Sequence, residues 1–133
     1  MSRYVVDTSI AVEYLLRTPL GLSVAGLVED DYPLAPEIMD VEVLSVLRRA
    51  VLRGDLEVPR ARLAVEYLTR WPVQRISHRD LIPLAWEHFQ NVTAMDAFYV
   101  AAARVYGVPV LTADGRLSRA PGLGVAVQYV RMG

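Results

Sequence analysis

The chain has 133 residues, enough for one compact domain and too few for two of ordinary size, so we expect a single domain over 1–133. Hydrophobic residues make up 53% and charged residues 22%, which predicts a well-filled core and argues against disorder. The formal net charge is −1, so a nucleic-acid partner must be bound by a local patch, not by a bulk positive field.

Cysteine is absent, which excludes a disulfide framework, a cysteine-ligated zinc site and a catalytic thiol. The first apolar run ends at Asp7 after three residues, unlike a signal peptide, and no apolar stretch approaches the roughly 20 residues of a membrane helix. We therefore expect a cytoplasmic protein with no membrane contact. All 14 basic residues are arginine, whose planar guanidinium pairs well with phosphate.

Short β-rich runs alternate with helical patterns along the whole chain. The predicted strands cover residues 3–6, 32–35, 73–77, 108–111 and 125–130. The predicted helices cover residues 8–17, 21–30, 36–53, 59–71, 80–90 and 93–107, and residues 112–115 are predicted as a loop. Gly54 and Gly107 are expected to end the helices that precede them. This alternation predicts an α/β fold with a parallel sheet covered on both faces.

Four acidic residues are expected at one edge of that sheet. Right-handed crossovers place the loops after parallel strands on the same edge, where ligands bind in open α/β sheets. Asp7 and Asp114 directly follow predicted strands. Glu42 interrupts the apolar stripe of a helix, and Asp96 lies in the first turn of a strongly apolar helix.

Each of these acids also has a purely structural explanation. Asp7 could cap the following helix, and Asp114 could be a turn residue. Asp96 completes a capping box that begins at Thr93, and Glu42 could turn toward solvent. Taken as a set at one sheet edge, however, the four acids favour a functional site.

The four carboxylates could share one pocket only if their mutual repulsion were relieved. Two carboxylates ~4 Å apart repel by about 4 kcal/mol at an effective dielectric constant of ~20. Protonation or a divalent cation relieves that repulsion, and a set of oxygen ligands suits Mg²⁺ or Mn²⁺. Neither a catalytic serine–histidine arrangement nor a glycine-rich phosphate loop is evident in the sequence, so metal-assisted phosphodiester hydrolysis is the chemistry that it best allows.

Four segments of the sequence resemble the PIN-domain ribonucleases, and most closely the VapC toxins of type II toxin–antitoxin systems. They are Val5-Val6-Asp7-Thr8-Ser9, Pro36-Glu37-Ile38 with Glu42-Val43-Leu44 and Leu47-Arg48-Arg49, Asp96 to Ala103, and Leu111 to Leu117. Each segment is weak evidence for the family by itself, but the order of the four segments and the length of the chain make the resemblance specific.

The resemblance implies a three-layer α/β/α fold with a central parallel sheet of four to five strands. It also implies an endoribonuclease that uses Mg²⁺ or Mn²⁺, forms a homodimer and is inhibited by a VapB-type antitoxin. The residues that match the family's acidic quartet, as catalytic and metal-binding groups, are Asp7, Glu42, Asp96 and Asp114. The supporting hydroxyls that match are Thr8 or Ser9, with Thr112.

We hypothesise that the three aspartates hold the metal, while Glu42 holds either a second metal or the attacking water. Arg48 and Arg49 lie less than two helical turns beyond Glu42, and Arg116 follows Asp114, so these arginines are candidate contacts for RNA or antitoxin; the alternative is that they form solvated salt bridges. We expect His78 and His88 at the surface rather than in catalysis.

Three other functions share parts of this pattern. A PIN-like module could bind RNA or protein without cleavage, although the complete quartet argues against this. A housekeeping nuclease for RNA maturation is a second possibility. A phosphoryl-transfer receiver domain also clusters acids at strand ends, but it needs a lysine, and the chain has none.

Overall fold

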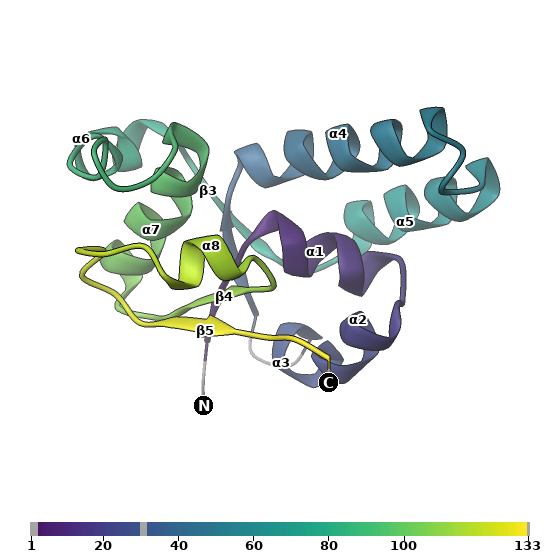
Figure 1. Cartoon of the computed structure of the whole chain (residues 1–133), viewed down its shortest axis with the longest axis horizontal. Coiled ribbons are helices and arrows are strands. Elements are labelled where there is room, and N and C mark those ends of the chain that lie inside the picture. Colours follow the sequence, from purple (N-terminus) through teal and green to yellow (C-terminus); the bar gives the residue numbers. More distant parts are fainter. Residues whose placement is uncertain (1–2, 30–31, 133) are drawn as a thin grey trace.

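Figure 1 shows the computed structural model, which describes residues 3–29 and 32–132. The strands are β1 (Val5–Val6), β2 (Leu34–Pro36), β3 (Gln74–Ile76), β4 (Val110–Thr112) and β5 (Val127–Tyr129). The helices are α1 (Thr8–Leu15), α2 (Pro19–Ser23), α3 (Ala25–Glu29), α4 (Ile38–Leu52), α5 (Val58–Arg70), the 3₁₀ turn η1 (Arg79–Leu81), α6 (Ile82–Trp86), α7 (Ala94–Tyr106) and α8 (Gly115–Ser118).

The five strands form one parallel sheet in the order β3-β2-β1-β4-β5. Successive connections run from β1 outward to β3 and then return past β1 to β4, so the strand order reverses between β1 and β4. With right-handed crossovers, such a reversal puts helices on both faces of the sheet. Figure 1 shows α6 and α7 on one side of β1 and β2, and α1 and α5 on the other. This confirms the predicted α/β fold class.

Helix α7 forms the centre of the core on its face of the sheet and contacts β1, β2 and β4. Its run from Val100 to Ala103 is buried, and the small alanine side chains let the helix lie close to the strands. Gly107 ends the helix with φ of +66°, a left-handed conformation that glycine adopts without strain. Both the start at Thr93 and the end at Gly107 are as predicted.

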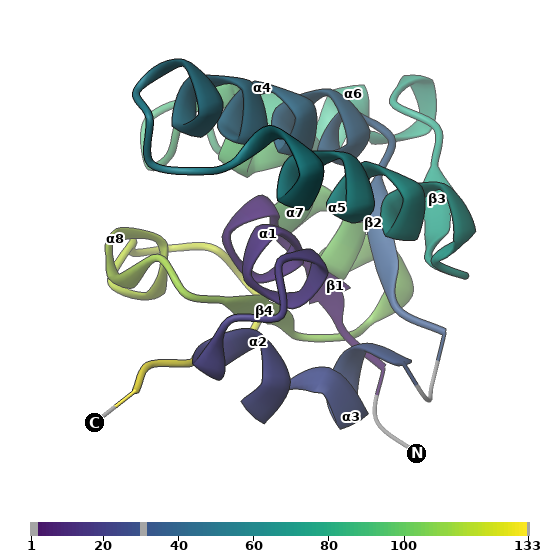
Figure 2. The ribbon, with the colours of Figure 1, turned by 90° about the vertical axis from the view of Figure 1, so that its right-hand side faces the viewer.

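Helices α1, α4 and α5 pack against one another on the opposite face, above α2 and α3 in Figure 2. Pro59 lies in the first turn of α5, and Gly54, with φ of +81°, follows the end of α4, both as predicted. Gly21 of α2 lies against the backbone of α1, where an added Cβ would be 1.9 Å from the carbonyl oxygen of Glu13. A side chain at this position would therefore separate the two helices.

Several predicted boundaries are wrong. Pro36 ends β2 instead of starting α4, because residues 34–36 pair with β3. The helix predicted over 21–30 is two helices that meet at Val24; its predicted end at residue 30 lies outside the described residues. The helix predicted over 80–90 ends at Trp86 and continues as i→i+3 turns. The loop predicted over 112–115 instead contains the end of β4 and the start of α8.

Within residues 3–29 and 32–132, no helix is both long enough and apolar enough to cross a bilayer.

Candidate active site

Two of the predicted acids lie where the strand order reverses. Strands β1 and β4 are neighbours, with Val5 opposite Val110 and Val6 opposite Leu111. Asp7 follows β1 and Asp114 lies two residues beyond the end of β4, so both are at the carboxyl edge of the sheet. In open α/β sheets this reversal point is where ligands bind.

Both aspartates also cap the helix that follows them. The Oδ1 atom of Asp7 accepts a hydrogen bond of 3.2 Å from the amide of Ile10, at the start of α1. The Oδ1 atom of Asp114 accepts one of 2.9 Å from the amide of Arg116, at the start of α8. The structural and functional explanations are therefore compatible, because capping is what fixes each carboxylate at the sheet edge.

Asp96 lies in the first turn of α7, in a capping arrangement with Thr93. The Thr93 hydroxyl accepts a hydrogen bond of 3.2 Å from the Asp96 amide, and hydrogen bonding with Thr93 also works to lower the pKa of the Asp96 carboxyl. The Asp96 side chain is 23% exposed. Its carboxylate thus remains at the positive end of a helix dipole, facing a cavity.

Glu42 is held inward by two hydroxyl groups. Its Oε1 atom accepts a hydrogen bond of 2.6 Å from Tyr99 on α7 and one of 3.0 Å from Thr8 on α1. The two hydroxyls are themselves 2.7 Å apart. This arrangement argues against the alternative in which Glu42 turns to solvent. Three helices from both faces of the sheet position this one carboxylate.

Two other hydroxyls bind Asp7. Ser9 donates to its Oδ1 atom at 2.6 Å, and Thr112 donates to its Oδ2 atom. The same hydroxyl oxygens accept hydrogen bonds from the amides of Ala113, at 2.8 Å, and Asp114, at 2.9 Å. These contacts join the β1 and β4 loops. The hydroxyl near Asp7 is thus Ser9, while Thr8 serves Glu42.

All four predicted acids line one cavity of about 530 Å³, which we call the acidic cavity. Arg49 and Arg116 also line it, whereas Arg48 does not. The remaining lining residues are Thr8, Ser9, Val12, Glu13, Val46, Tyr99 and Ala113.

Sequence reasoning missed two polar residues of this cavity, Tyr99 and Glu13. Tyr99 lies three residues after Asp96, a spacing that puts both on one helix face. Glu13 lies four residues after Ser9, and its carboxylate accepts a hydrogen bond from Thr18. Both residues could therefore have been predicted from the sequence, because each lies one helical turn after a predicted site residue.

Burial and mutual repulsion change the acidity of these groups. Burial raises the pKa of Asp7 to about 6, against the lowering effect of its hydrogen bonds from Ser9, Thr112 and Ile10, and the charge of Asp96 adds to the rise. Burial likewise raises the pKa of Asp96, and the neighbouring charge of Asp114 contributes. These shifts indicate carboxylates that lack sufficient positive charge around them.

Arg116 supplies part of the missing positive charge. Its Nη2 atom is 3.0 Å from Oδ2 of Asp114 and 3.9 Å from Oδ2 of Asp96. Partial burial works to raise the pKa of Asp114, but the hydrogen bonds and charge of Arg116 hold that pKa below its usual value. The guanidinium therefore lies between two of the predicted metal ligands.

The donor chemistry of the acidic cavity fits a hard divalent cation, because the four acids and their supporting hydroxyls offer oxygen atoms alone. As the side chains stand, no group of three or more acidic or histidine residues in the described part of the chain is close enough together to hold a metal ion. In this arrangement the Arg116 guanidinium lies beside both Asp96 and Asp114.

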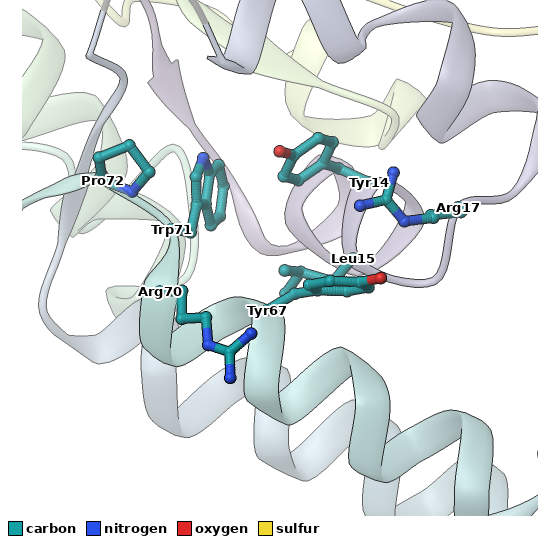
Figure 3. A pocket seen from close by; sticks show the side chains of 7 residues that line it. All are labelled: Tyr14, Leu15, Arg17, Tyr67, Arg70, Trp71 and Pro72. Atoms are coloured by element: carbon teal, nitrogen blue, oxygen red, sulfur yellow. The ribbon is translucent and has the colours of Figure 1, made fainter.

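A second, smaller cavity of about 170 Å³ lies at the carboxyl ends of α1 and α5 (Figure 3). The rings of Tyr14 and Trp71 meet at its edge, with centroids 5.1 Å apart, and the Arg17 guanidinium lies 4.5 Å from the centre of the Tyr67 ring. No acid lines this cavity, so it is not part of the acidic site.

The expected surface position of His88 is wrong. This side chain is only 3% exposed, because it packs beneath α7, where its Nε2 atom is 3.3 Å from Nη1 of Arg104. Burial lowers the pKa of His88, and the charge of Arg104 adds to the effect. Neither His88 nor His78 lines the acidic cavity.

Together, the fold and the cavity define a parallel α/β protein with an acidic pocket at its strand reversal. The family model described as PIN domain matches residues 4–123, and the chain belongs to this family. This confirms the resemblance seen in the sequence.

Curated relatives extend the match over nearly the whole chain. Ribonuclease VapC1 of Mycobacterium tuberculosis is 38% identical over 133 residues, which cover 98% of this chain and 100% of the relative. Ribonuclease VapC12 of the same organism is 34% identical over 126 residues, or 95% of this chain and 98% of the relative. Ribonuclease VapC3 is 38% identical over 117 residues, or 87% and 85%.

Proposed function

We propose that this chain acts as one PIN domain, an endoribonuclease that hydrolyses RNA phosphodiesters as the toxin of a VapBC-type pair. The observation that carries the proposal is the convergence of Asp7, Glu42, Asp96 and Asp114 on one cavity at the strand reversal. Its similarity over nearly full length to proteins named as VapC ribonucleases supports the same activity.

In this proposal Asp7, Asp96 and Asp114 hold Mg²⁺ or Mn²⁺. When bound, the cation lowers the pKa of a water molecule and stabilises charge on the phosphate. Asp7 is suited to the role because its carboxylate is fixed by Ser9 and Thr112 and is nevertheless short of positive charge. Binding a cation relieves the repulsion that the three aspartates impose on one another.

Glu42 orients the attacking water or a second metal ion. Among residues 3–29 and 32–132, Thr8 and Tyr99 both donate to Oε1 of this carboxylate, and Oε2 accepts no hydrogen bond from them. A carboxylate held by two hydroxyls loses rotational freedom, and fixed geometry is what proximity catalysis requires. Tyr99 and Thr8 are therefore positioning residues for Glu42.

Arg49 and Arg116 bind the phosphate backbone of the RNA at the rim of the cavity. We propose a cytoplasmic location, a VapB-type antitoxin as partner, and a homodimer as the working form. Trp86 and Phe89 support the last point, because their stacked rings, 4.8 Å apart, are 69% and 57% exposed.

The direct test is RNA cleavage by the purified chain with Mg²⁺ or Mn²⁺, compared with an Asp96→Asn variant. The Thr93 cap uses the amide of Asp96, so this variant should fold normally while losing cleavage by at least about a hundredfold. A variant that cuts RNA at the parent's rate would refute the assignment of Asp96. Calorimetric titration with Mn²⁺ distinguishes the nuclease from a non-cleaving binding module, which has no need of the ion.

A further inference from the structure

A third cavity, of about 350 Å³, opens beside the acidic cavity and shares Asp96 and Arg116 with it. It lies between the turns that follow α6 and the segment around α8. We call it the amide cavity, because its polar side chains are Gln90, Asn91 and Thr93. Anything bound in it therefore lies next to Asp96, one of the proposed catalytic acids, and to Arg116.

The lining of the amide cavity differs chemically from that of the acidic cavity. Val92, Leu117 and Ala120 give it an apolar wall, and Leu117 is only 2% exposed. Apart from the two shared residues, it contains no charged side chain. Such a surface is poorly suited to a metal ion or to a phosphate, but it suits a flat, neutral and polar-edged group.

The side-chain amides of Gln90 and Asn91 are available to hydrogen-bond with a ligand. The side chains of Gln90 and Asn91 have no hydrogen-bond partner within residues 3–29 and 32–132. Each carboxamide offers both donors and an acceptor, the combination that reads the edge of a nucleobase. The Nδ2 atom of Asn91 lies beside Gly122, where an added Cβ would be 3.2 Å away. This amide therefore lies close to the loop after α8.

We propose that the amide cavity binds the nucleobase next to the cleaved phosphodiester and that Gln90 and Asn91 select which base is accepted. This inference rests on the proposed ribonuclease activity and adds a specificity site to it. A volume of about 350 Å³ is at the lower end of small-ligand pockets and suits one nucleoside. Single-stranded RNA presents its bases in this way, with faces against apolar groups and edges toward hydrogen-bonding side chains.

Arg116 connects the two cavities in this arrangement. Its guanidinium lies at their common boundary, where it can bind the phosphate that joins the base in the amide cavity to the scissile position. The base and the reacting phosphate then belong to adjacent nucleotides. Base recognition and cleavage are thereby coupled through one short stretch of backbone.

The test is cleavage of a random-sequence single-stranded RNA pool, followed by sequencing of the cut ends. We expect the parent to prefer particular bases at one nucleotide beside the cut. In the double variant Gln90→Ala/Asn91→Ala, the ratio of cleavage at preferred bases to cleavage at other bases should fall about tenfold. One or two neutral hydrogen bonds provide roughly this much discrimination. Gln128→Ala, an exposed amide on β5, is the matched control and should keep the parent's preference.

The variant Asn91→Asp separates recognition from a merely structural role. It replaces the NH2 group, with its two donors, by an acceptor oxygen of similar size and adds a negative charge, so the cleavage rate should fall and the preferred base should also change. Cleavage by the parent with no base preference, or with a preference that all these variants retain, overturns the base site and leaves the nuclease intact. Failure of the parent to cut RNA overturns the proposed function, and the base site with it.

Discussion

Tyr99 and Glu42 are 57 residues apart in the chain, yet the Tyr99 hydroxyl donates a hydrogen bond of 2.6 Å to Oε1 of Glu42. The bond crosses from α7, on one face of the sheet, to α4. Burial raises the pKa of Tyr99, and the hydrogen bond to Glu42 adds to the rise, so this hydroxyl keeps its proton and acts as a donor.

Tyr99→Phe should lower the RNA cleavage rate by about tenfold, because losing one hydrogen bond of roughly 1.4 kcal/mol loosens the Glu42 carboxylate. The fold should survive, since the ring keeps its packing. Tyr106→Phe is the matched control on the same helix: its hydroxyl accepts a bond from Gln74 outside the acidic cavity. Equal rates for both variants would mean that Tyr99 does not position Glu42.

Asp7→Asn should abolish cleavage and, without divalent ions, stabilise the folded chain at neutral pH. The pKa of Asp7 is raised from 3.8 to about 6, so its ionised form opposes folding by about 3 kcal/mol. Below about pH 4 both states hold the proton. Between about pH 4 and pH 6 the Asp7 carboxyl is ionised in the unfolded chain but still protonated in the folded one. The parent therefore becomes less stable as the pH rises through that range.

Thermal unfolding at pH 4 and pH 7.5 checks this prediction. The melting temperature of Asp7→Asn should exceed the parent's at pH 7.5, and the difference should largely vanish at pH 4. Asp55→Asn, at an exposed position, should match the parent at both values. A lower melting temperature for Asp7→Asn at pH 7.5 would show that its hydrogen bonds outweigh its desolvation.

Arg116→Ala should bind Mn²⁺ more tightly than the parent, by roughly two- to fivefold, because the guanidinium no longer competes for Asp96 and Asp114. Calorimetry at low salt measures this without requiring catalysis. Arg119→Ala, an exposed arginine just after α8, serves as the control and should leave the affinity unchanged. Weaker Mn²⁺ binding by Arg116→Ala would contradict the competition.

Arg48 and Arg49 offer a test of RNA contact at neighbouring positions. Both are exposed, but only Arg49 lines the acidic cavity. Arg49→Ala should weaken RNA binding and reduce the slope of log affinity against log salt by about 1, as expected for one lost phosphate contact. Arg48→Ala should leave the slope near the parent's. Titrations of labelled RNA at several salt concentrations give both slopes, and identical slopes would remove Arg49 from the interface.

Local features of the sequence were sufficient to predict the fold class and the four acids. The apolar run that stops at Asp7, the capping pattern from Thr93 to Asp96 and the glycine at 107 each depend on interactions within one helical turn. Such short-range preferences are readable from neighbouring residues, and alternation of strands with helices restricts the topology to a parallel sheet.

The tertiary structure decided how those acids are supported and which basic residues reach them. Thr112 binds Asp7 across 105 positions because β1 and β4 are adjacent strands, and Tyr99 meets Glu42 because α7 and α4 approach the same sheet edge. Strand order and helix rotation depend on packing of the whole core, so no local pattern specifies them. For the same reason, the sequence could not show that Arg49, and not Arg48, lines the acidic cavity.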